Sequence, residues 1–337
     1  MSFAVEPFGA AHVPAAAALL AARHRADRTH EPGLPADGED PGAAAAIVAA
    51  IARSAPGVVA IRRGRVVGYL LGSTILPVPA TRGALYLDPR SALVGYAGHA
   101  VDPADDPSAI YRALYAALSP AWVDVGYYVH YVAVPASDRA ARDAWFSLGF
   151  GHDATLALRD TTAPGAGAPD VDVRRGTAGD LDDVVEMALG LYRHHASAPI
   201  YLPYLAEVEP DERSAQAQAL VDPECAHWIA RRERRAVGMH VLQPPPPWLS
   251  ALLRAERSTY LLHGYTEAAA RGSGVGRALL GRSLAWAREA GHTHCLLHFL
   301  AANVSGARFW LAAGFRPIEL RLRRAVDGRI AWARPRQ

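Results

Sequence analysis

The chain has 337 residues, of which 51% are hydrophobic and 20% are charged, and its formal net charge at pH 7 is +2. This composition is typical of a globular protein of about two domains, and the nearly neutral charge favours neither a nucleic-acid partner nor a membrane surface. Two cysteines, Cys225 and Cys295, are too few for a disulfide framework, and the N-terminal apolar run at residues 13–22 is too short to span a bilayer. We therefore expect a cytoplasmic protein.

The first half of the chain begins with a predicted strand at residues 3–5 and an amphipathic helix over residues 12–23. Residues 59–72 contain two apolar runs joined by a short charged turn, which is the pattern of a β-hairpin. Residues 161–170, TTAPGAGAPD, combine alanine, glycine and proline with almost nothing to bury, which is a linker composition. This linker divides the chain into residues 1–160 and residues 171–337.

The second half repeats the pattern of the first half. Residues 228–241 resemble the hairpin of residues 59–72. Residues 271–279 (RGSGVGRAL) match residues 106–114 (DPSAIYRAL), and Trp310-Leu-Ala-Ala-Gly314-Phe315 matches Trp145-Phe-Ser-Leu-Gly149-Phe150 at the same offset without a gap. The second half is expected to hold strands at residues 171–173, 259–266 and 294–300, and helices at residues 180–194, 275–290 and 305–313.

The alternation of strands and helices in each half predicts a mixed sheet flanked by helices, in the α/β (α+β) fold class. Residues 243–253, QPPPPWLSALL, contain a proline run that cannot join a central ladder. We predict that this segment is a surface excursion.

The glycine-rich stretch Arg271-Gly-Ser-Gly-Val-Gly276 lies between a predicted strand and a predicted helix. Backbone N–H groups are unpaired at a helix N-terminus and point toward bound anions, and glycine allows a close approach. The stretch is neither a dinucleotide fingerprint nor a P-loop, because Arg277 replaces the third glycine and no Lys-Ser/Thr follows. The alternative is a helix start that is merely rich in glycine.

The downstream sequence extends this pattern. Asn303-Val-Ser-Gly306-Ala-Arg-Phe309-Trp310-Leu-Ala-Ala-Gly314-Phe315 follows the next predicted strand. Together with R-x-x-G-x-G, this resembles the GNAT acyltransferase superfamily, whose members bind acetyl-coenzyme A. The match covers the second half, and the first half resembles the same fold without the pyrophosphate loop. Two such domains in tandem are similar to mycothiol synthase-like two-domain acetyltransferases.

The resemblance implies that two parallel strands separate into a V-shaped slot for the pantetheine arm, and that the glycine-rich loop holds the pyrophosphate. Asn303 would contact the pantetheine. The implied cofactor-binding residues are Gly264, Tyr265, Thr266, Arg271, Gly272, Ser273, Gly274, Val275, Gly276, Arg277 and Asn303. In the first half, Ala109 and Tyr111 replace Gly274 and Gly276, and Asp106 replaces Arg271. We therefore expect one coenzyme A per chain, bound in the second half.

The catalytic side of the resemblance is incomplete, because Trp310 stands where the family often has a proton-donating tyrosine. Tyr260 is the best-placed candidate base on the strand before the loop. His263 would face the acceptor if a β-bulge shifted the register, and His298 on the adjacent strand is a third candidate. For His263, a half-buried strand side chain without a catalytic role is an equally good interpretation.

The acceptor is expected near residues 192–214, where aromatic and carboxylate side chains would suit a cationic amine. Tyr201, Tyr204 and Glu207 are the candidates, and a polar surface loop is the alternative. No metal site is predicted, because the HxxxH spacing of His294 and His298 would place them about 13 Å apart on a strand.

These observations predict an acetyl-coenzyme A-dependent N-acetyltransferase that acts on the amine of a small molecule by direct attack on the thioester. The first half would be a structural or acceptor-pocket partner, so that the chain is a monomeric pseudo-dimer or forms a homodimer. The alternatives are an acyl-coenzyme A-binding regulatory protein without turnover, favoured by Trp310, and a transferase for a longer acyl group. An antibiotic, a thiol precursor, a polyamine or a protein N-terminus would each fit as acceptor.

Overall fold

The computed structural model of the protein describes residues 3–162 and 171–333. Most of the predicted linker, residues 163–170, lies outside the described residues. Thr161 is buried, and its hydroxyl donates to the carbonyl oxygen of His292 at 3.0 Å. We keep residues 160 and 171 as the proposed limits of what we call the first half and the second half.

The first half opens with a strand, two helices and a hairpin. Asp40 and Asp106 cap helices that begin with proline, and each carboxylate accepts the N–H of the third residue beyond it. The strands are β1 (Ala4–Pro7), β2 (Gly57–Arg62), β3 (Arg65–Leu71), β4 (Ser73–Ile75), β5 (Ser91–Val94), β6 (His99–Val101), β7 (Val129–Pro135) and β8 (Gly151–Asp160); the helices are α1 (Val13–His30), α2 (Pro41–Ala52), α3 (Pro107–Leu118), α4 (Pro120–Val123) and α5 (Arg139–Ser147).

The second half repeats this order. Gly291 and Gly314, with φ of +83° and +87°, follow the last two helices and allow the chain to leave each of them in the left-handed conformation. The strands are β9 (Asp172–Arg175), β10 (Ala226–Arg232), β11 (Arg235–Gln243), β12 (Ser258–Thr266), β13 (His294–Leu300) and β14 (Arg316–Ala325); the helices are α6 (Leu181–Ala196), α7 (Glu209–Val221), α8 (Val275–Glu289) and α9 (Val304–Ala312).

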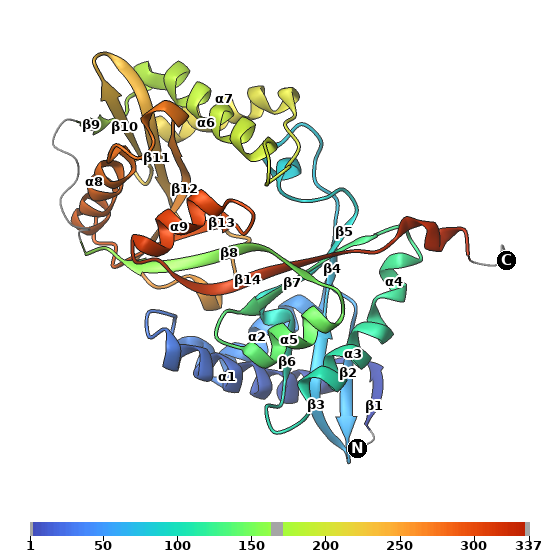
Figure 1. Cartoon of the computed structure of the whole chain (residues 1–337). Helices are drawn as coiled ribbons and strands as arrows, with labels where there is room; N and C mark the ends of the chain where they lie inside the picture. Colours follow the sequence, from blue (N-terminus) through green and yellow to red (C-terminus); the bar gives the residue numbers. More distant parts are fainter. Residues whose placement is uncertain (1–2, 163–170, 334–337) are drawn as a thin grey trace.

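The strands form a four-stranded sheet in the order β1-β2-β3-β6 and a ten-stranded sheet in the order β4-β5-β7-β14-β8-β13-β12-β11-β10-β9. The pairs β5–β7 and β12–β13 are parallel, and the other pairs are antiparallel. Figure 1 shows helices α6 and α7 above the large sheet and α1 and α2 below its centre. The predicted mixed sheet flanked by helices is confirmed.

The two halves share the large sheet through their last strands. β8, from the first half, lies between β13 and β14, and β14, from the second half, lies between β8 and β7. Figure 1 shows these two long strands crossing the middle of the molecule between the two groups of helices. The boundary between the halves is therefore a continuous hydrogen-bonded ladder rather than a contact of two closed sheets.

The prediction that residues 243–253 lie on the surface is wrong for the second part of this segment. Trp248 is 69% exposed, but Leu249, Leu252 and Leu253 are buried against Ala16 and other residues of α1 and α2. The prolines exclude a strand, as predicted, but they do not determine which side chains are buried. The segment thus joins the second half to the helices of the first half.

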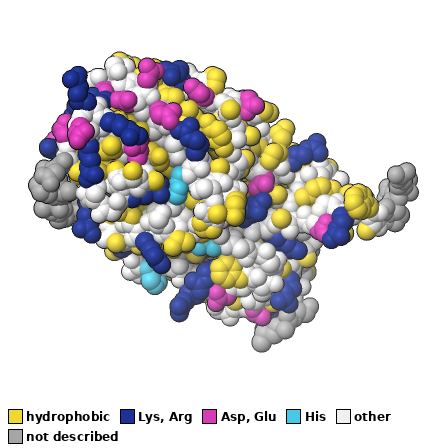
Figure 2. All heavy atoms as spheres, turned by 45° about the horizontal axis from the view of Figure 1, so that its top comes forward, with side chains coloured by type: hydrophobic (Ala, Val, Ile, Leu, Met, Phe, Trp, Pro, Cys, Tyr) yellow, Lys and Arg dark blue, Asp and Glu magenta, His cyan; other side chains and the backbone are white. Residues whose placement is uncertain are grey.

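Among the described residues, no helix has both the length and the apolar character that crossing a bilayer requires. On the face shown in Figure 2, basic and acidic side chains are interspersed rather than gathered by sign. This distribution agrees with the nearly neutral charge of the whole chain.

Candidate active site

β12 and β13 are paired only over their first part. The parallel pairs run from Ser258–His294 to Leu261–Leu297. Within the described residues, the two strands then continue to Thr266 and Leu300 without pairing with each other. The backbone groups that line this V-shaped opening lack a strand partner, so an extended ligand arm can add to them as a strand would. We call this opening, together with the loop of residues 271–277, the cofactor slot.

A β-bulge lies where the opening begins. Leu261 pairs with Leu242 of β11 and His263 pairs with Val241, so Leu262 is the extra residue. The bulge is the condition under which His263 was predicted to face the acceptor, and it is present. Tyr260 and His263 both line the same cavity.

The glycine-rich loop has the geometry of an anion site. Gly272 and Gly274 have φ of +75° and +87°, values that favour glycine. The first helical bond of α8 runs from the N–H of Ala278 to Gly274, and among the described residues the N–H groups from Gly272 to Arg277 have no hydrogen-bond partner. Six adjacent donors at the positive end of α8 are therefore free to bind a pyrophosphate.

Two polar side chains stand beside this loop. Arg271 is exposed, and its Nε donates to the carbonyl oxygen of Thr266 at 3.1 Å. The side-chain oxygen of Asn303 accepts the N–H of Gly306 at 3.1 Å and so caps α9. Both residues line the cavity, as expected, although part of the hydrogen-bonding capacity of Asn303 is used within its own helix.

Trp310 packs beneath the cofactor slot. A Cβ atom on Gly264 would lie 2.7 Å from its indole ring, and one on Gly276 would lie 3.2 Å from the ring of Phe309. The aromatic residues of α9 thus leave little or no room for a side chain at either glycine. The indole of Trp310 contacts Phe315 and His240 with ring centroids 5.6 and 5.7 Å apart, which is a packing role.

A continuous cavity of about 1610 Å³ joins the cofactor slot to the boundary between the halves. Its second part, which we call the acceptor chamber, lies on the face of the large sheet that α1 and α2 cover. The residues that define the chamber are Tyr96, Trp248, Tyr260, His298, Glu319 and Arg321. An arm that passed through the slot would therefore end in a chamber built by both halves.

Residues 191–315 match the family model "Acetyltransferase (GNAT) family". These residues form a GNAT acetyltransferase domain within the second half. Members of this family transfer an acyl group from acyl-coenzyme A, and the slot and its loop lie within the matched residues. No match was found among curated proteins.

Solved structures show the same fold over almost the whole chain. A GCN5-related N-acetyltransferase from Sphaerobacter thermophilus is 17% identical, with 96% of this chain and 95% of that chain covered and a TM-score of 0.59. A glucosamine N-acetyltransferase region of a fungal multi-domain β-N-acetylglucosaminidase is 14% identical, with coverage of 96% and 38% and a TM-score of 0.52. A tandem GNAT protein from the clavulanic acid pathway is 15% identical over both full chains, with a TM-score of 0.48.

An aromatic cluster lies where the cofactor slot meets the acceptor chamber. The hydroxyl of Tyr260 lies 2.9 Å from Nδ1 of His298, and the ring of Trp248 lies over His298 with centroids 5.5 Å apart. Burial lowers the pKa of His298 to about 3, so its imidazole is neutral at neutral pH. Burial raises the pKa of Tyr260 well above its ordinary range, so its hydroxyl keeps its proton.

His263 belongs to a second, more enclosed network. Its ring nitrogens lie 3.4 Å from the hydroxyl of Tyr192 and 3.2 Å from Nε2 of Gln216, and Glu212 accepts hydrogen bonds from both of these side chains. Burial lowers the pKa of His263, and the carboxylate of Glu212 opposes that shift. His263 is thus held on both sides, whereas Nε2 of His298 has no partner within the described residues.

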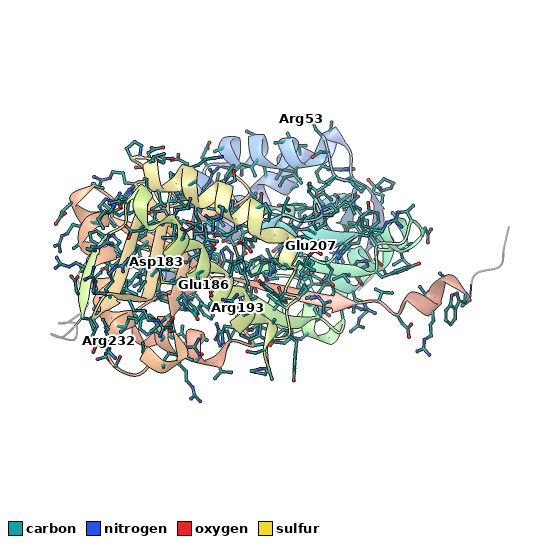
Figure 3. The ribbon with its side chains drawn as sticks, turned by 90° about the horizontal axis from the view of Figure 1, so that it is seen from above. Arg53, Asp183, Glu186, Arg193, Glu207 and Arg232 are labelled. Carbon is teal, nitrogen blue, oxygen red and sulfur yellow. The ribbon has the colours of Figure 1, made fainter. Side chains whose placement is uncertain are left out.

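The predicted acceptor residues Tyr201, Tyr204 and Glu207 do not line the cavity. Tyr201 is 74% exposed, and Glu207 is also exposed. Figure 3 shows Asp183, Glu186 and Arg193 following one another along α6, with Glu207 beyond that helix. The same region instead contributes Tyr192, His194, His195 and Asp211 to the cavity.

Sequence reasoning missed Glu319, which lines the chamber from β14 and is 8% exposed. It also missed Tyr86, Tyr96 and Arg82, by which the first half reaches the cavity. Within the described ranges, no group of three or more His, Cys, Asp or Glu side chains is arranged to hold a metal ion.

Proposed function

We propose that the protein is an acetyl-coenzyme A-dependent N-acetyltransferase whose acceptor is the amine of a small molecule. The observation that carries this proposal is the continuity of the free N–H groups of the loop, the separated strands and the enclosed chamber. Pyrophosphate would bind at residues 272–277 with Arg271, and pantetheine would lie against Gly264–Thr266 of β12. This order places the thioester where β12 and β13 separate.

The reaction in this proposal is direct attack. The amine nitrogen forms a bond to the thioester carbon, a backbone N–H of β12 beyond Leu261 stabilises the oxyanion, and the carbon–sulfur bond then breaks. The nitrogen becomes more acidic than a free ammonium group as the new bond forms, and the neutral imidazole of His298 is placed to take its proton at Nε2. The proton ends on the departing thiolate, and the products are the amide and coenzyme A.

Tyr260 is assigned a positioning role in this mechanism: its hydroxyl oxygen accepts a hydrogen bond from Nδ1–H of His298, which leaves the lone pair of Nε2 free to take the proton. His263, whose ring nitrogens are both occupied, is assigned to shaping the slot. Trp310 offers no proton at neutral pH, so the thiolate leaves without an acid from that position. The first half provides a wall of the chamber, and the free thiols of Cys225 and Cys295 agree with a cytoplasmic site of action.

Two measurements test this proposal. Calorimetry with acetyl-coenzyme A should show binding to the intact protein, and binding should be lost when Gly274 and Gly276 are both changed to glutamate. Thiol release with a panel of small primary amines should then show turnover that the same change abolishes. Absence of binding would contradict the proposal, and binding without turnover of any amine would favour the regulatory alternative that Trp310 suggests.

A further inference from the structure

The acceptor chamber contains a carboxyl group without a partner. Glu319 is 8% exposed and lines the cavity, yet within the described residues its carboxyl makes no hydrogen bond and no ion pair within 4.0 Å. A buried carboxylate is normally paired, because the protein interior solvates a lone charge poorly. Because Glu319 lines a cavity that a ligand can enter, we take its missing partner to be a ligand.

The cations nearest to Glu319 are already paired. Arg23, from α1, donates to the carbonyl oxygens of Tyr96 and His99 and lies 3.9 Å from Asp27. Arg321, on the same strand, donates from Nε to Asp153 at 2.6 Å. The other titratable group that affects Glu319 is the hydroxyl of Tyr96, which donates to Asp27 at 2.5 Å. No residue of the described chain therefore forms an ion pair with Glu319 within 4.0 Å.

The ionisation behaviour of Glu319 agrees with this arrangement. Burial raises the pKa of its carboxyl to about 7, against the opposing effect of Arg321 and Arg23. A cation bound beside it would favour the ionised form at neutral pH.

The sheet sets the distance between Glu319 and the reacting end of the chamber. Glu319 and His298 are both paired with Leu156 of β8, from opposite sides, so the three side chains project from one face of the sheet. Two strand spacings place the backbones of His298 and Glu319 about 10 Å apart. Small side chains, Ala133 and Ala154, leave the space open in this part of the cavity.

Apolar groups line the rest of the chamber. Ile47 and Ile51 enter from α2, Leu93 from β5, and Trp248 from the loop after β11. A ligand that reached from His298 to Glu319 would therefore pass along apolar walls and end at a carboxylate. The cation at Glu319 would be distinct from the nitrogen that reacts near His298.

We propose that Glu319 binds a second cationic group of the acceptor, so that the acceptor is a primary amine joined by an apolar stretch to another positive charge. This inference rests on the proposed function, because it takes the chamber to be the acceptor site. It assigns Glu319 to substrate selection and gives it no part in the acyl transfer itself.

The test compares 1,6-diaminohexane with 6-aminohexan-1-ol, which keeps the length and the reacting amine but replaces the distal charge. Thiol release from acetyl-coenzyme A should show a kcat/KM at least 10-fold higher for the diamine, mainly through KM. Glu319→Gln, which keeps the size of the side chain, should remove this preference and leave the KM for acetyl-coenzyme A unchanged. Glu224→Gln, at an exposed carboxylate far from the chamber, should preserve it.

Calorimetry of the same pair in the presence of coenzyme A gives a readout that does not need turnover. Tighter binding of the diamine to the natural chain, lost in Glu319→Gln, supports the proposal even if neither probe is acetylated. Equal binding of the two probes to the natural chain, or an unchanged preference in Glu319→Gln, overturns it. Acetyl-coenzyme A turnover with other amines would then leave the proposed function standing.

Discussion

The first half contains a copy of the cofactor slot that its own side chains fill. β5 pairs with β7 in parallel, as β12 does with β13, and β6 then turns away to pair with β3. In the resulting opening, His99 places Nδ1 at 2.8 Å from the hydroxyl of Tyr111 and Nε2 at 2.9 Å from the carbonyl oxygen of Ala133. In the second half, the positions of His99 and Tyr111 are occupied by Gly264 and Gly276.

The helix that follows each opening differs in the same way. Asp106 caps α3 by accepting the N–H of Ala109 at 3.2 Å, so a carboxylate stands where the second half presents free donors and Arg271. The comparison shows that separated strands alone do not make a cofactor site. The opening must also be free of side chains, and the helix start must be left uncapped by an acidic residue.

The largest expected effect comes from placing the tyrosine of the first half, Tyr111, at the corresponding position of the cofactor slot, Gly276. Gly276→Tyr places a phenol in the cofactor slot, where even a Cβ atom would lie 3.2 Å from the ring of Phe309. We expect the affinity for acetyl-coenzyme A to fall by at least about 1,000-fold, which corresponds to about 4 kcal/mol. Calorimetry measures this directly.

Gly281→Ala is the matched control, because a Cβ atom on this glycine of α8 meets nothing within 4 Å. It should bind acetyl-coenzyme A as the natural chain does and should be slightly more stable, since alanine favours the helix. Normal binding by Gly276→Tyr would show that the pyrophosphate does not lie at this loop.

The next largest effect comes from removing the side chain of Tyr111, which fills the opening of the first half. Tyr111 is 1% exposed and packs against Trp145, so Tyr111→Ala should lower the free energy of unfolding by about 3–4 kcal/mol. The number of acetyl-coenzyme A molecules bound should stay the same, because Asp106 still caps α3. Denaturant unfolding and calorimetry give the two values, and a gain of a second binding site would contradict the account.

The secondary structure and the cofactor loop could be predicted because their signals are local. The free donors of residues 272–277 follow from a short glycine-rich pattern at a helix start. The bulge beside His263 was only a condition of its prediction, and no sequence pattern required it. The placement of β8 between β13 and β14 could not be predicted, because no local pattern in either strand names its neighbours. Which strands become neighbours is a property of the whole sheet and not of one segment.

Glu319 illustrates why the acceptor chamber was missed. It alternates along β14 with Leu320 and Leu322, which pack in the core of the first half, so the pattern assigns Glu319 and Arg321 to a solvent-facing side. In the folded chain that side is covered by α1 and α2 and becomes the chamber. Tyr201 and Tyr204 lie outside the cavity lining. Their segment is irregular, so no periodicity fixed the direction of their side chains.

The buried carboxyl of Glu319 should make the free energy of unfolding depend on pH. Its pKa of about 7 lies above the ordinary value of 4.5, so the folded state favours the protonated carboxyl and loses stability as the pH rises from 4.5 to 7. Glu319→Gln removes this loss. Relative to the natural chain, its free energy of unfolding should rise between pH 4.5 and pH 8 by about 3 kcal/mol at most.

Unfolding by denaturant at several pH values measures this difference. Glu224→Gln, at an exposed carboxylate, should show no such trend. If the free energies of unfolding of Glu319→Gln and the natural chain differed by the same amount at every pH, the carboxyl of Glu319 would not have a raised pKa in the folded state.

The smallest expected effect comes from removing a helix cap, which can be done at equivalent positions of the two halves. Asn303 caps α9 and Asp138 caps α5 at corresponding positions of the two halves. Asn303→Ala and Asp138→Ala should each lower the free energy of unfolding by about 1 kcal/mol. Only Asn303→Ala should also weaken acetyl-coenzyme A binding, and equal binding by the two variants would remove Asn303 from the cofactor site.

The central claim is that one half has kept the site and the other has closed it. Native mass spectrometry of the full chain with increasing acetyl-coenzyme A measures the number of bound molecules per chain. The account predicts that the natural chain saturates at one molecule and that Gly276→Tyr binds none. Saturation at two molecules, or one molecule still bound by Gly276→Tyr, would contradict it.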